Sequence, residues 1–592
     1  MHRYYKINIR LNLYKIMQYK KLGLVIYFFF LFVNAFSQTK TENIKFISPV
    51  DFPIYLSGNF GEIRAEHFHS GIDIKTQGVE GKKIFAVENG YVSRIKISAN
   101  GYGKTLYIEH PNGYTSVYAH LSRFNHIIDK IVKELQYENK TFEINYFPKP
   151  NEIPVKKGQV IAYSGNTGRS FGPHLHFEIR ETNYQVPINP LYFKFDIKDD
   201  IAPQINYVAI YALDNNSKIN HQHKKLILPV VKNNGDYILQ DTSLLLVEGN
   251  IGFGIELYDY VNGSNNKCGI YTLSLFIDSL LIYNHKVDKV SFGETAYVKS
   301  HIDFAERNAT ERTIQKTFIA PNNQLSLYKS VQNRGIFTFT EDTTHLVKLV
   351  ATDVYGNTSY VSFKVKGMHP ELPEPYTFSN TKKQLMHWET ENVFENEEIK
   401  IRIPENALFD TLLFNYSTSD TSLTNAYSKI HHIHNENIPL FKKYSFSIKI
   451  KNVQDALKSK LFIARIAADN TLDYIGGEVI NDFIVAEANT FGSFVVLSDT
   501  LNPLIIPLLS KKGLIHSNGS IRFLIKDTLS GIESYNGFID NNWALFEYDA
   551  KNDLLFYTID NERIEKNKEH ELELFVMDKT GNITTYYQTF YW

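Results

Sequence analysis

The sequence has almost no cysteine, since Cys268 is the single one among 592 residues. One thiol excludes an intrachain disulfide and any cysteine-rich metal site, because both need at least two sulfur atoms. We therefore expect Cys268 to be a small, buried hydrophobic residue. The folded domains must then be held together by packing alone.

The sequence also lacks an excess of charge of either sign. Its 63 Lys and Arg residues balance 64 Asp and Glu residues, which gives a formal net charge of −1. Such a balance offers no electrostatic reason to expect nucleic acid or an anionic membrane surface as a partner. With 43% hydrophobic and 21% charged residues the composition is that of a globular protein, and its length predicts several domains.

Aromatic residues, by contrast, are abundant: 38 Tyr and 41 Phe contribute to an aromatic content of 14%. Because aromatic side chains fit a pleated, half-buried surface, this favours a mostly β fold. Asn-Gly turns at 89–90 and 112–113 between short apolar runs predict β-hairpins. We predict an antiparallel β-sheet domain at 38–199, with an insert at about 125–151 that begins with an amphipathic helix at 125–137.

One apolar run of about a dozen residues, 22–33, follows two lysines near the N-terminus and precedes a small-x-small site that ends at Ser37. The run is shorter than the about 20 residues that a membrane span needs. We therefore predict a signal peptide at 1–37, cleaved after Ser37, with translation starting at Met1 or Met17 and an uncleaved anchor as the alternative. The mature protein is expected in the periplasm or cell envelope, without a stable transmembrane segment.

An internal repeat occupies the later part of the chain. The segment 249–259 resembles 519–527, and each copy is followed by Gly-Ile and then by Phe-Ile-Asp. Both copies end in an Asp-x-x-Gly-Asn segment, at 353–357 and 578–582. These residue types suit tight connections between strands, so a structural role is expected for both turns.

The repeat predicts two immunoglobulin-like β-sandwiches, at about 200–367 and 499–592. The stretch between them, 368–498, opens with a proline-bearing linker and is predicted to be another β-rich module.

Three histidine-bearing segments stand out near the N-terminus. They are His67–Asp73, Tyr118–Leu121 and Gly165–Glu178. Residues two or four apart in a strand share a face, so His174 projects with His176, and His69 projects with Asp73 if that segment is extended. Two imidazoles and a carboxylate would make a zinc site with an open position for water. A further histidine beside the metal would take the proton of the water or stabilise the developing oxyanion.

Taken together, the motifs resemble the lysostaphin/LytM-type (M23) family of zinc endopeptidases. The resemblance covers positions 60–190, about a quarter of the chain, and the motifs occur in family order: His69-Ser-Gly-Ile-Asp73, Gly101-Tyr-Gly103, Tyr118-Ala-His120-Leu121, Val155–Ile161, Ser164–Gly168 and Gly172-Pro-His-Leu-His-Phe-Glu178.

The resemblance implies that His69, Asp73 and His176 are ligands of Zn²⁺. It also implies that His120 and His174 form a catalytic pair, which positions the water and stabilises the tetrahedral intermediate. The implied fold is an antiparallel β-sheet groove, and the implied substrates are the peptide stems or cross-bridges of peptidoglycan.

Three neighbouring polar residues call for separate interpretations. His67 is expected to line the groove or to be structural, because its spacing to Asp73 does not match the motif. His110 precedes a Pro-Asn-Gly turn and is expected to flank it. Glu178 shares the face of the His-x-His pair, where it either orients a ligand imidazole or is simply part of the sheet.

The sequence thus predicts an exported, zinc-dependent endopeptidase that hydrolyses peptide bonds in peptidoglycan stems or cross-links. Peptidoglycan is the expected partner, with a cell-envelope regulatory protein as a second candidate. One alternative is a non-catalytic regulator or scaffold of cell-wall hydrolases, as in relatives that have lost zinc ligands, although none of the five motif residues is substituted here. The other is a peptidase that acts on protein substrates.

Overall fold

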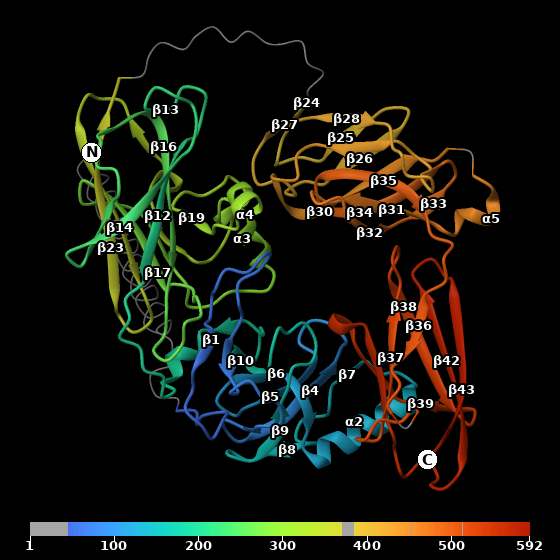
Figure 1. The fold of residues 1–592 in the computed structure, drawn as a ribbon. Coiled ribbons are helices and arrows are strands. Elements are labelled where there is room, and N and C mark those ends of the chain that lie inside the picture. The colour runs from blue at the N-terminus through green and yellow to red at the C-terminus, as the bar shows by residue number, and fades with distance from the viewer. Residues whose placement is uncertain (1–44, 370–383, 452, 512) are drawn as a thin grey trace, which may run out of the picture. The chain divides into compact units, whose positions relative to one another are not determined.

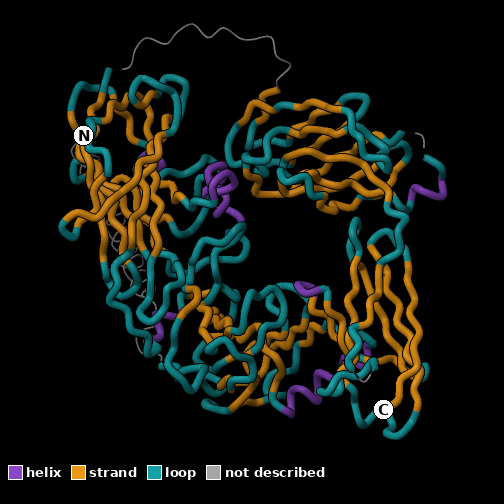
Figure 2. The backbone as a smooth tube through the Cα atoms, in the orientation of Figure 1, coloured by secondary structure: helices purple, strands orange, loops and turns teal. Residues whose placement is uncertain are grey.

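The computed structural model describes residues 45–369, 384–451, 453–511 and 513–592. Strands dominate each part of the described chain and helices are few and short (Figures 1 and 2). The mostly β prediction is therefore confirmed. The predicted signal peptide at 1–37 lies outside the described residues. Within them, no helix has the length and apolar character needed to cross a membrane.

The described residues fall into two compact units of very different size. Phe46 and Leu191–Phe195 belong to a small unit, in which the rings of Phe46 and Phe193 lie 5.1 Å apart. It includes most of the 3-10 helix η2 (Pro190–Phe193). Residues 47–190 and 196–592 form the large unit.

The first part of the large unit contains an eleven-stranded sheet, in which every pairing is antiparallel. Its main path runs, in spatial order, through β1 (Leu56–Gly58), β2 (Ile72–Lys75), β10 (His174–Glu181), β6 (Tyr114–Phe124), β5 (Lys104–Glu109), β4 (Gly90–Ile97) and β7 (Ile144–Tyr146). Four further strands pair off this path: β3 (Lys83–Phe85), β8 (Pro154–Val155), β9 (Val160–Ser164) and β11 (Pro187–Ile188).

The residues of strand β10 alternate between an apolar face and a polar face. Leu175, Phe177 and Ile179 on one face are fully buried apolar residues, whereas His174, His176, Glu178 and Arg180 occupy the other face. Because β10 lies between β2 and β6, the polar face looks onto residues from both neighbours. In this register His176 lies directly opposite Asp73 of β2 and Ala119 of β6.

The insert after β6 contains the predicted helix, observed as α2 (His126–Asn139). Asn125 caps its N-terminus, since the side-chain oxygen accepts a hydrogen bond from the Ile128 N–H at 3.1 Å. Ile128, Val132 and Gln136 are buried at spacings of four residues, so one stripe of the helix packs inward.

The next part of the large unit is a twelve-stranded sheet with its own hydrophobic core. Its strands are β12 (Gln204–Ala212), β13 (Lys218–Ile219), β14 (Leu226–Asn233), β15 (Asp236–Leu239), β16 (Leu245–Tyr258), β17 (Thr272–Ile277), β18 (Leu280–Lys286), β19 (Ile314–Lys316), β20 (Tyr328–Val331), β21 (Phe337–Phe339), β22 (Thr344–Thr352) and β23 (Thr358–Gly367). The helical turns in this part are η3 (Thr295–Tyr297), α3 (Val298–His301), α4 (Phe304–Thr310) and η4 (Asn333–Gly335).

Residues 384–498 form two five-stranded sheets and one strand pair, which share a core. One sheet has β25 (Asn392–Glu395), β26 (Ile399–Ile403), β30 (Pro439–Lys449), β34 (Phe483–Thr490) and β33 (Glu478–Ile480). The other has β28 (Tyr416–Ser419), β29 (Ile430–Ile433), β35 (Gly492–Ser498), β31 (Leu461–Ile466) and β32 (Leu472–Gly476). The pair is β24 (Gln384–Met386) with β27 (Leu412–Phe414), and the helix is α5 (Asp455–Lys458).

Residues 499–592 form two four-stranded sheets around one core. The first contains β36 (Leu504–Pro507), β37 (Ser520–Lys526), β41 (Leu554–Thr558) and β40 (Phe546–Asp549). The second contains β39 (Asn542–Ala544), β38 (Ile532–Ile539), β42 (Glu569–Asp578) and β43 (Ile583–Tyr591), and η5 (Ala550–Asn552) follows β40. The immunoglobulin-like assignment and the domain limits at 199, 367 and 498 stay predictions.

The two repeated turns adopt the same geometry. The turn at 353–357 joins β22 to β23, and the turn at 578–582 joins β42 to β43. In each, the N–H of the aspartate donates to the carbonyl of the asparagine four residues later, at 3.1 and 3.0 Å. The glycines have φ angles of 94° and 78°, a region that glycine adopts without steric cost.

Removing the cap of α2 tests how the insert is held. We expect Asn125→Ala to destabilise the helix by about 1 kcal/mol, because the Ile128 N–H loses its acceptor. Hydrogen exchange of the α2 amides should then accelerate about fivefold. The exposed Glu138→Ala in the same helix is the control, and equal exchange in both variants would contradict the capping role.

Candidate active site

Three side-chain atoms converge on the polar face of β10. Nε2 of His69 lies 2.9 Å from Nδ1 of His176 and 3.0 Å from Oδ1 of Asp73. Nδ1 of His176 lies 2.9 Å from the same Oδ1. All three residues are buried, and the facing strands β2 and β10 hold two of them in direct register.

The remaining hydrogen bonds of the two imidazoles define their tautomers. Nδ1 of His69 is 2.7 Å from the carbonyl oxygen of Asn59, and Nε2 of His176 is 2.8 Å from Oε1 of Glu178. A carbonyl or carboxylate oxygen only accepts, so these two nitrogens carry the protons. Without a metal, a proton on Nδ1 of His176 donates to Oδ1 of Asp73 at 2.9 Å; a metal ion would instead use the lone pairs of this nitrogen and of Nε2 of His69. Two imidazole nitrogens and one carboxylate oxygen that converge in this way suit a divalent metal.

The electrostatics of these groups favour positive charge at the same point. Burial lowers the pKa of His69 to about 4. Burial also acts to lower the pKa of His176, but the neighbouring carboxylates of Asp73 and Glu178 outweigh it and raise that pKa to about 9. The pKa of Asp73 stays well below its usual value despite burial, because the surrounding histidines stabilise the carboxylate.

Glu178 is the centre of a supporting network. Its carboxylate is 0% exposed and accepts hydrogen bonds from Ser70 Oγ at 2.8 Å, Tyr102 Oη at 2.5 Å and Arg180 Nε at 2.5 Å. Burial alone would raise the pKa of Glu178, but Arg180 and His176 hold it below the usual value. Glu178 therefore stays ionised and fixes the ring of His176.

The other two predicted residues lie beside the three ligand candidates. His120 of β6 and His174 of β10 have ring centroids 4.8 Å apart, and the His120 and His176 centroids are 5.9 Å apart. Nδ1 of His120 donates to the carbonyl of Thr167, and Nδ1 of His174 donates to that of Gly172, both at 2.8 Å. Both rings therefore keep an unprotonated Nε2 in their neutral form. Burial lowers the pKa of His120 to about 3, and the neighbouring His176 and His174 add to this effect.

Two residues that the sequence analysis did not single out also support the site. Arg64 Nη2 lies 2.6 Å from Oδ2 of Asp73, which leaves Oδ1 for the facing imidazoles. Asn59 accepts from His69 through its backbone, while its side chain exchanges two 2.7 Å hydrogen bonds with the backbone of Gly269. Neither residue belongs to a recognisable motif, so spacing could not identify them.

The two remaining histidines near the motifs do not join the cluster. His67 is exposed on the segment before β2. His110 is buried beside the turn, where Nδ1 lies 2.9 Å from the carbonyl of Asn89 and Nε2 lies 2.7 Å from Oγ of Ser116. His110 thus has the turn-flanking role expected of it.

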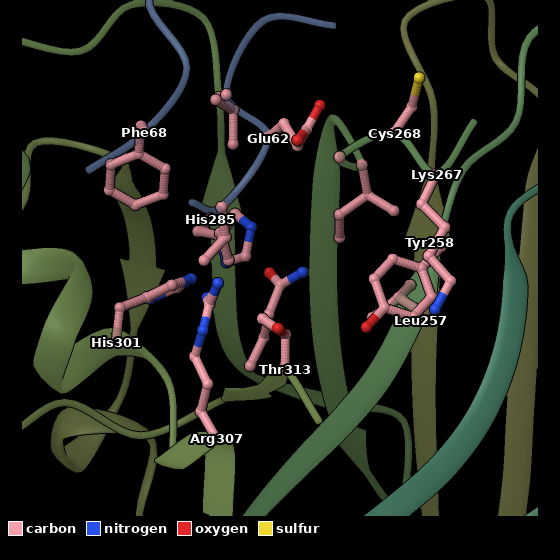
Figure 3. A pocket seen from close by; sticks show the side chains of 16 residues that line it. Glu62, Phe68, Leu257, Tyr258, Lys267, Cys268, His285, His301, Arg307 and Thr313 are labelled. Atoms are coloured by element: carbon pink, nitrogen blue, oxygen red, sulfur yellow. The ribbon is translucent and has the colours of Figure 1, made fainter. Parts of the chain in front are cut away.

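A separate cavity of about 220 Å³ lies elsewhere in the large unit (Figure 3). It is lined by residues that include Glu62, Phe68, Cys268, His285 and His301, and by none of the five motif residues. Cys268 is 2% exposed, and burial raises the pKa of its thiol. It is therefore the small buried residue that the sequence predicted, with an unreactive thiol.

Comparisons with known proteins agree with this geometry. The model of peptidase family M23 matches residues 67–137 and 149–190, and the unmatched interval lies inside the predicted insert. A Zu5-like domain model matches residues 383–499.

Curated relatives resemble the same part of the chain. The DD-carboxypeptidase/endopeptidase Mpg of Neisseria meningitidis serogroup B is 35% identical over 123 residues, which are 21% of this chain and 22% of that protein. The murein hydrolase activator NlpD of Escherichia coli is 35% identical over 127 residues, which are 22% of this chain and 26% of that protein. The chain therefore spans about a quarter of the length of the curated relatives it matches.

Solved structures resemble this part as well. One is the catalytic domain of the prophage-encoded M23 protein EnpA from Enterococcus faecalis, solved as a point mutant. The match is 26% identical, covers 24% of this chain and 95% of the EnpA chain, and has a TM-score of 0.19. Another is the catalytic domain of lysostaphin from Staphylococcus simulans. The match is 24% identical, covers 23% of this chain and 87% of the lysostaphin chain, and has a TM-score of 0.17. The family match at 67–137 and 149–190 and the curated relatives together show that this part of the chain is an M23-type peptidase domain.

Proposed function

We propose that the protein is an exported, zinc-dependent endopeptidase that hydrolyses peptide bonds in peptidoglycan stems or cross-links. The observation that supports this most strongly is the convergence of His69 Nε2, Asp73 Oδ1 and His176 Nδ1 at mutual separations of 2.9–3.0 Å. The outer nitrogens of both imidazoles contact oxygens of Asn59 and Glu178, so the inner nitrogens are directed at Asp73 and are positioned to bind one ion with it.

These three residues would hold the zinc ion. Two imidazole nitrogens and one carboxylate oxygen are a typical ligand set for catalytic zinc, and the fourth position stays open. When bound, zinc supplies Lewis-acid chemistry, in that it makes water a nucleophile near neutral pH and polarises a carbonyl group.

His120 and His174 would perform the proton transfers. Each ring has an unprotonated Nε2, because its Nδ1–H donates to a backbone carbonyl. Such a nitrogen accepts a proton from the attacking water and, once protonated, donates a hydrogen bond to the oxyanion or a proton to the leaving amine. The carbonyl groups of Thr167 and Gly172 fix the ring orientations, so little reorganisation is needed when the charge develops.

Glu178 and Arg64 would act as positioning residues. Glu178 holds the His176 ring through Nε2, and Arg64 holds the second oxygen of Asp73. Both contacts keep a ligand atom aimed at the shared point, which raises metal affinity without contact to the substrate.

The wall substrate and the location outside the cytoplasm rest on different support. The curated relatives include proteins named as an endopeptidase and as a murein hydrolase activator. Export rests on the predicted signal peptide. We further propose that the β regions after residue 200 space, tether or restrain the catalytic domain, with a cell-envelope regulatory protein as a candidate partner.

A non-catalytic regulatory role is the second candidate, because one relative is named as an activator. The complete ligand set and both flanking histidines favour an enzyme instead, since regulation alone does not require three converging metal ligands.

Substitutions separate metal binding from catalysis. We expect His176→Ala and Asp73→Ala to lose both zinc and activity, and His174→Ala to retain zinc while kcat falls about 100- to 10,000-fold. Zinc content by atomic emission and hydrolysis rates provide the measurements. His221→Asn, an exposed substitution distant in sequence, is the control. Full activity in either ligand variant would contradict the assigned roles.

Glu178→Gln tests the support of His176. The amide still offers an acceptor to Nε2 but removes the charge that pairs with Arg180, so zinc affinity should fall about 10- to 100-fold. Competition with a zinc-binding chromophore measures the zinc affinity of the variant and of the wild type. Glu181→Gln, in the same strand but on the other face, should keep the affinity of the wild type. A purely structural Glu178 would leave the zinc Kd unchanged.

Digestion of purified sacculi tests the reaction. The mature chain should release muropeptides whose masses identify a cleaved peptide bond, with release abolished by chelator and restored by zinc. Parallel assays with casein and free peptides test the protein-substrate alternative. Cleavage of casein alone would overturn the wall substrate, while unchanged cleavage in chelator would overturn the metal requirement.

A further inference from the structure

Three aspartates meet at the boundary between the M23 domain and the following β region. Asp199 precedes β12, Asp259 directly follows β16, and Asp353 directly follows β22. One carboxylate oxygen from each lies within 4.8 Å of the other two. Asp259 and Asp353 are each only 2% exposed, so the cluster is largely removed from water.

One of these carboxylates is not satisfied. Oδ1 of Asp259 is fully enclosed and has no hydrogen-bond partner among the described residues. By contrast, Asp199 accepts from the backbone N–H of Ile201, and Asp353 accepts from the N–H groups of its own turn. Within the described chain, no lysine or arginine forms an ion pair with any of these three aspartates. Lys198, the sequence neighbour of Asp199, pairs with Asp200 instead.

An enclosed group of three carboxylates without a cation is electrostatically unfavourable. Burial raises the pKa of Asp259 to about 8, and the charges of Asp199 and Asp353 contribute to the shift. A buried carboxylate is stable only when it is paired, protonated or bound to a metal. The cluster therefore needs either a proton or a bound cation.

The second copy of the repeat provides an internal comparison. Asp499, Asp527 and Asp578 form a cluster with the same separation limit. There, Oδ2 of Asp527 accepts from the N–H groups of three consecutive residues, and Asp499 and Asp578 also accept backbone hydrogen bonds. None of these three residues carries an enclosed oxygen that lacks a partner. Backbone donors satisfy this cluster, whereas the first cluster leaves one oxygen open.

We propose that Asp199, Asp259 and Asp353 bind one Ca²⁺ ion. An all-oxygen, triply negative set suits a hard divalent cation rather than zinc. Ca²⁺ accepts six to eight oxygens at about 2.3–2.6 Å, so oxygens up to about 5 Å apart fit around one ion. Backbone carbonyls and water would complete the shell.

Binding at this place would strengthen the start of the second β region. Asp199 lies where the chain leaves the M23 domain, and its carbonyl already accepts a 3.2 Å hydrogen bond from the side chain of Asn357. An ion would tie the same residue to the ends of β16 and β22. Ca²⁺ binding at this place would not require peptidase activity, because none of the three aspartates belongs to the zinc ligand candidates.

Calorimetric titration of the metal-stripped mature chain with CaCl₂ tests the proposal. We expect one saturable Ca²⁺ site and, at 100 times Kd, a rise in unfolding temperature of about 5–10 °C. Asp259→Asn and the less buried Asp199→Asn should each weaken binding at least tenfold. Asp527→Asn, in the backbone-satisfied cluster, should leave the site intact. Repeating the titration in the His176→Ala chain separates this site from the zinc site, and the Ca²⁺ affinity should be unchanged there.

Two results would overturn the proposal. One is that the wild-type chain binds no Ca²⁺ at millimolar concentration while Asp259→Asn raises the unfolding temperature, which would show that a proton satisfies the cluster. The other is that Ca²⁺ binding survives both Asp259→Asn and Asp199→Asn, which would place the ion elsewhere.

Discussion

The candidate active site depends on the register between β2 and β10. Because Asp73 lies directly opposite His176, a carboxylate and an imidazole from segments 103 residues apart meet on one face of the sheet. A slip of one residue would turn His176 to the apolar face, where Leu175 and Phe177 now pack. Burial of Leu175 and Phe177 therefore favours a single register, and this register also sets the positions of the polar side chains.

Satisfying buried polar groups is the second constraint on this site. His69, Asp73, His176 and Glu178 are all buried, and each hydrogen-bonds with named partners. The pairing of Glu178 with Arg180 keeps a carboxylate charged in the interior, and this carboxylate holds the ring of His176 through Nε2. The hydrogen bonds that satisfy these buried groups thus also fix the orientation of the ligand nitrogens.

The two repeated β regions show that similar sequences can produce similar turns in different electrostatic surroundings. Both Asp-x-x-Gly-Asn segments form the same backbone-bonded turn. The aspartate clusters beside them differ, however, because backbone N–H groups converge on Asp527 but leave Oδ1 of Asp259 without a donor. The same turn geometry is therefore compatible with different surroundings of the nearby aspartates.

Alternation and spacing were sufficient to predict much of this protein. The mostly β fold follows from the aromatic content and the Asn-Gly turns. The helix after residue 125 and the shared face of His174, His176 and Glu178 follow from local periodicity, which a strand or helix imposes directly. The motif resemblance also grouped His69, Asp73 and His120 with that face. The roles of these residues and the domain limits stay predictions.

Tertiary structure alone decided which polar groups support the site. Asn59 and Arg64 belong to no sequence motif, and although Ser70 and Tyr102 lie inside two of the motifs, their contacts with Glu178 depend on how separate loops fold. The same holds for Asp199, Asp259 and Asp353, which the sequence places at a predicted domain limit, at the end of a repeat segment and in a turn. Long-range strand pairing brings their carboxylates together, and no local pattern in the chain encodes that distance.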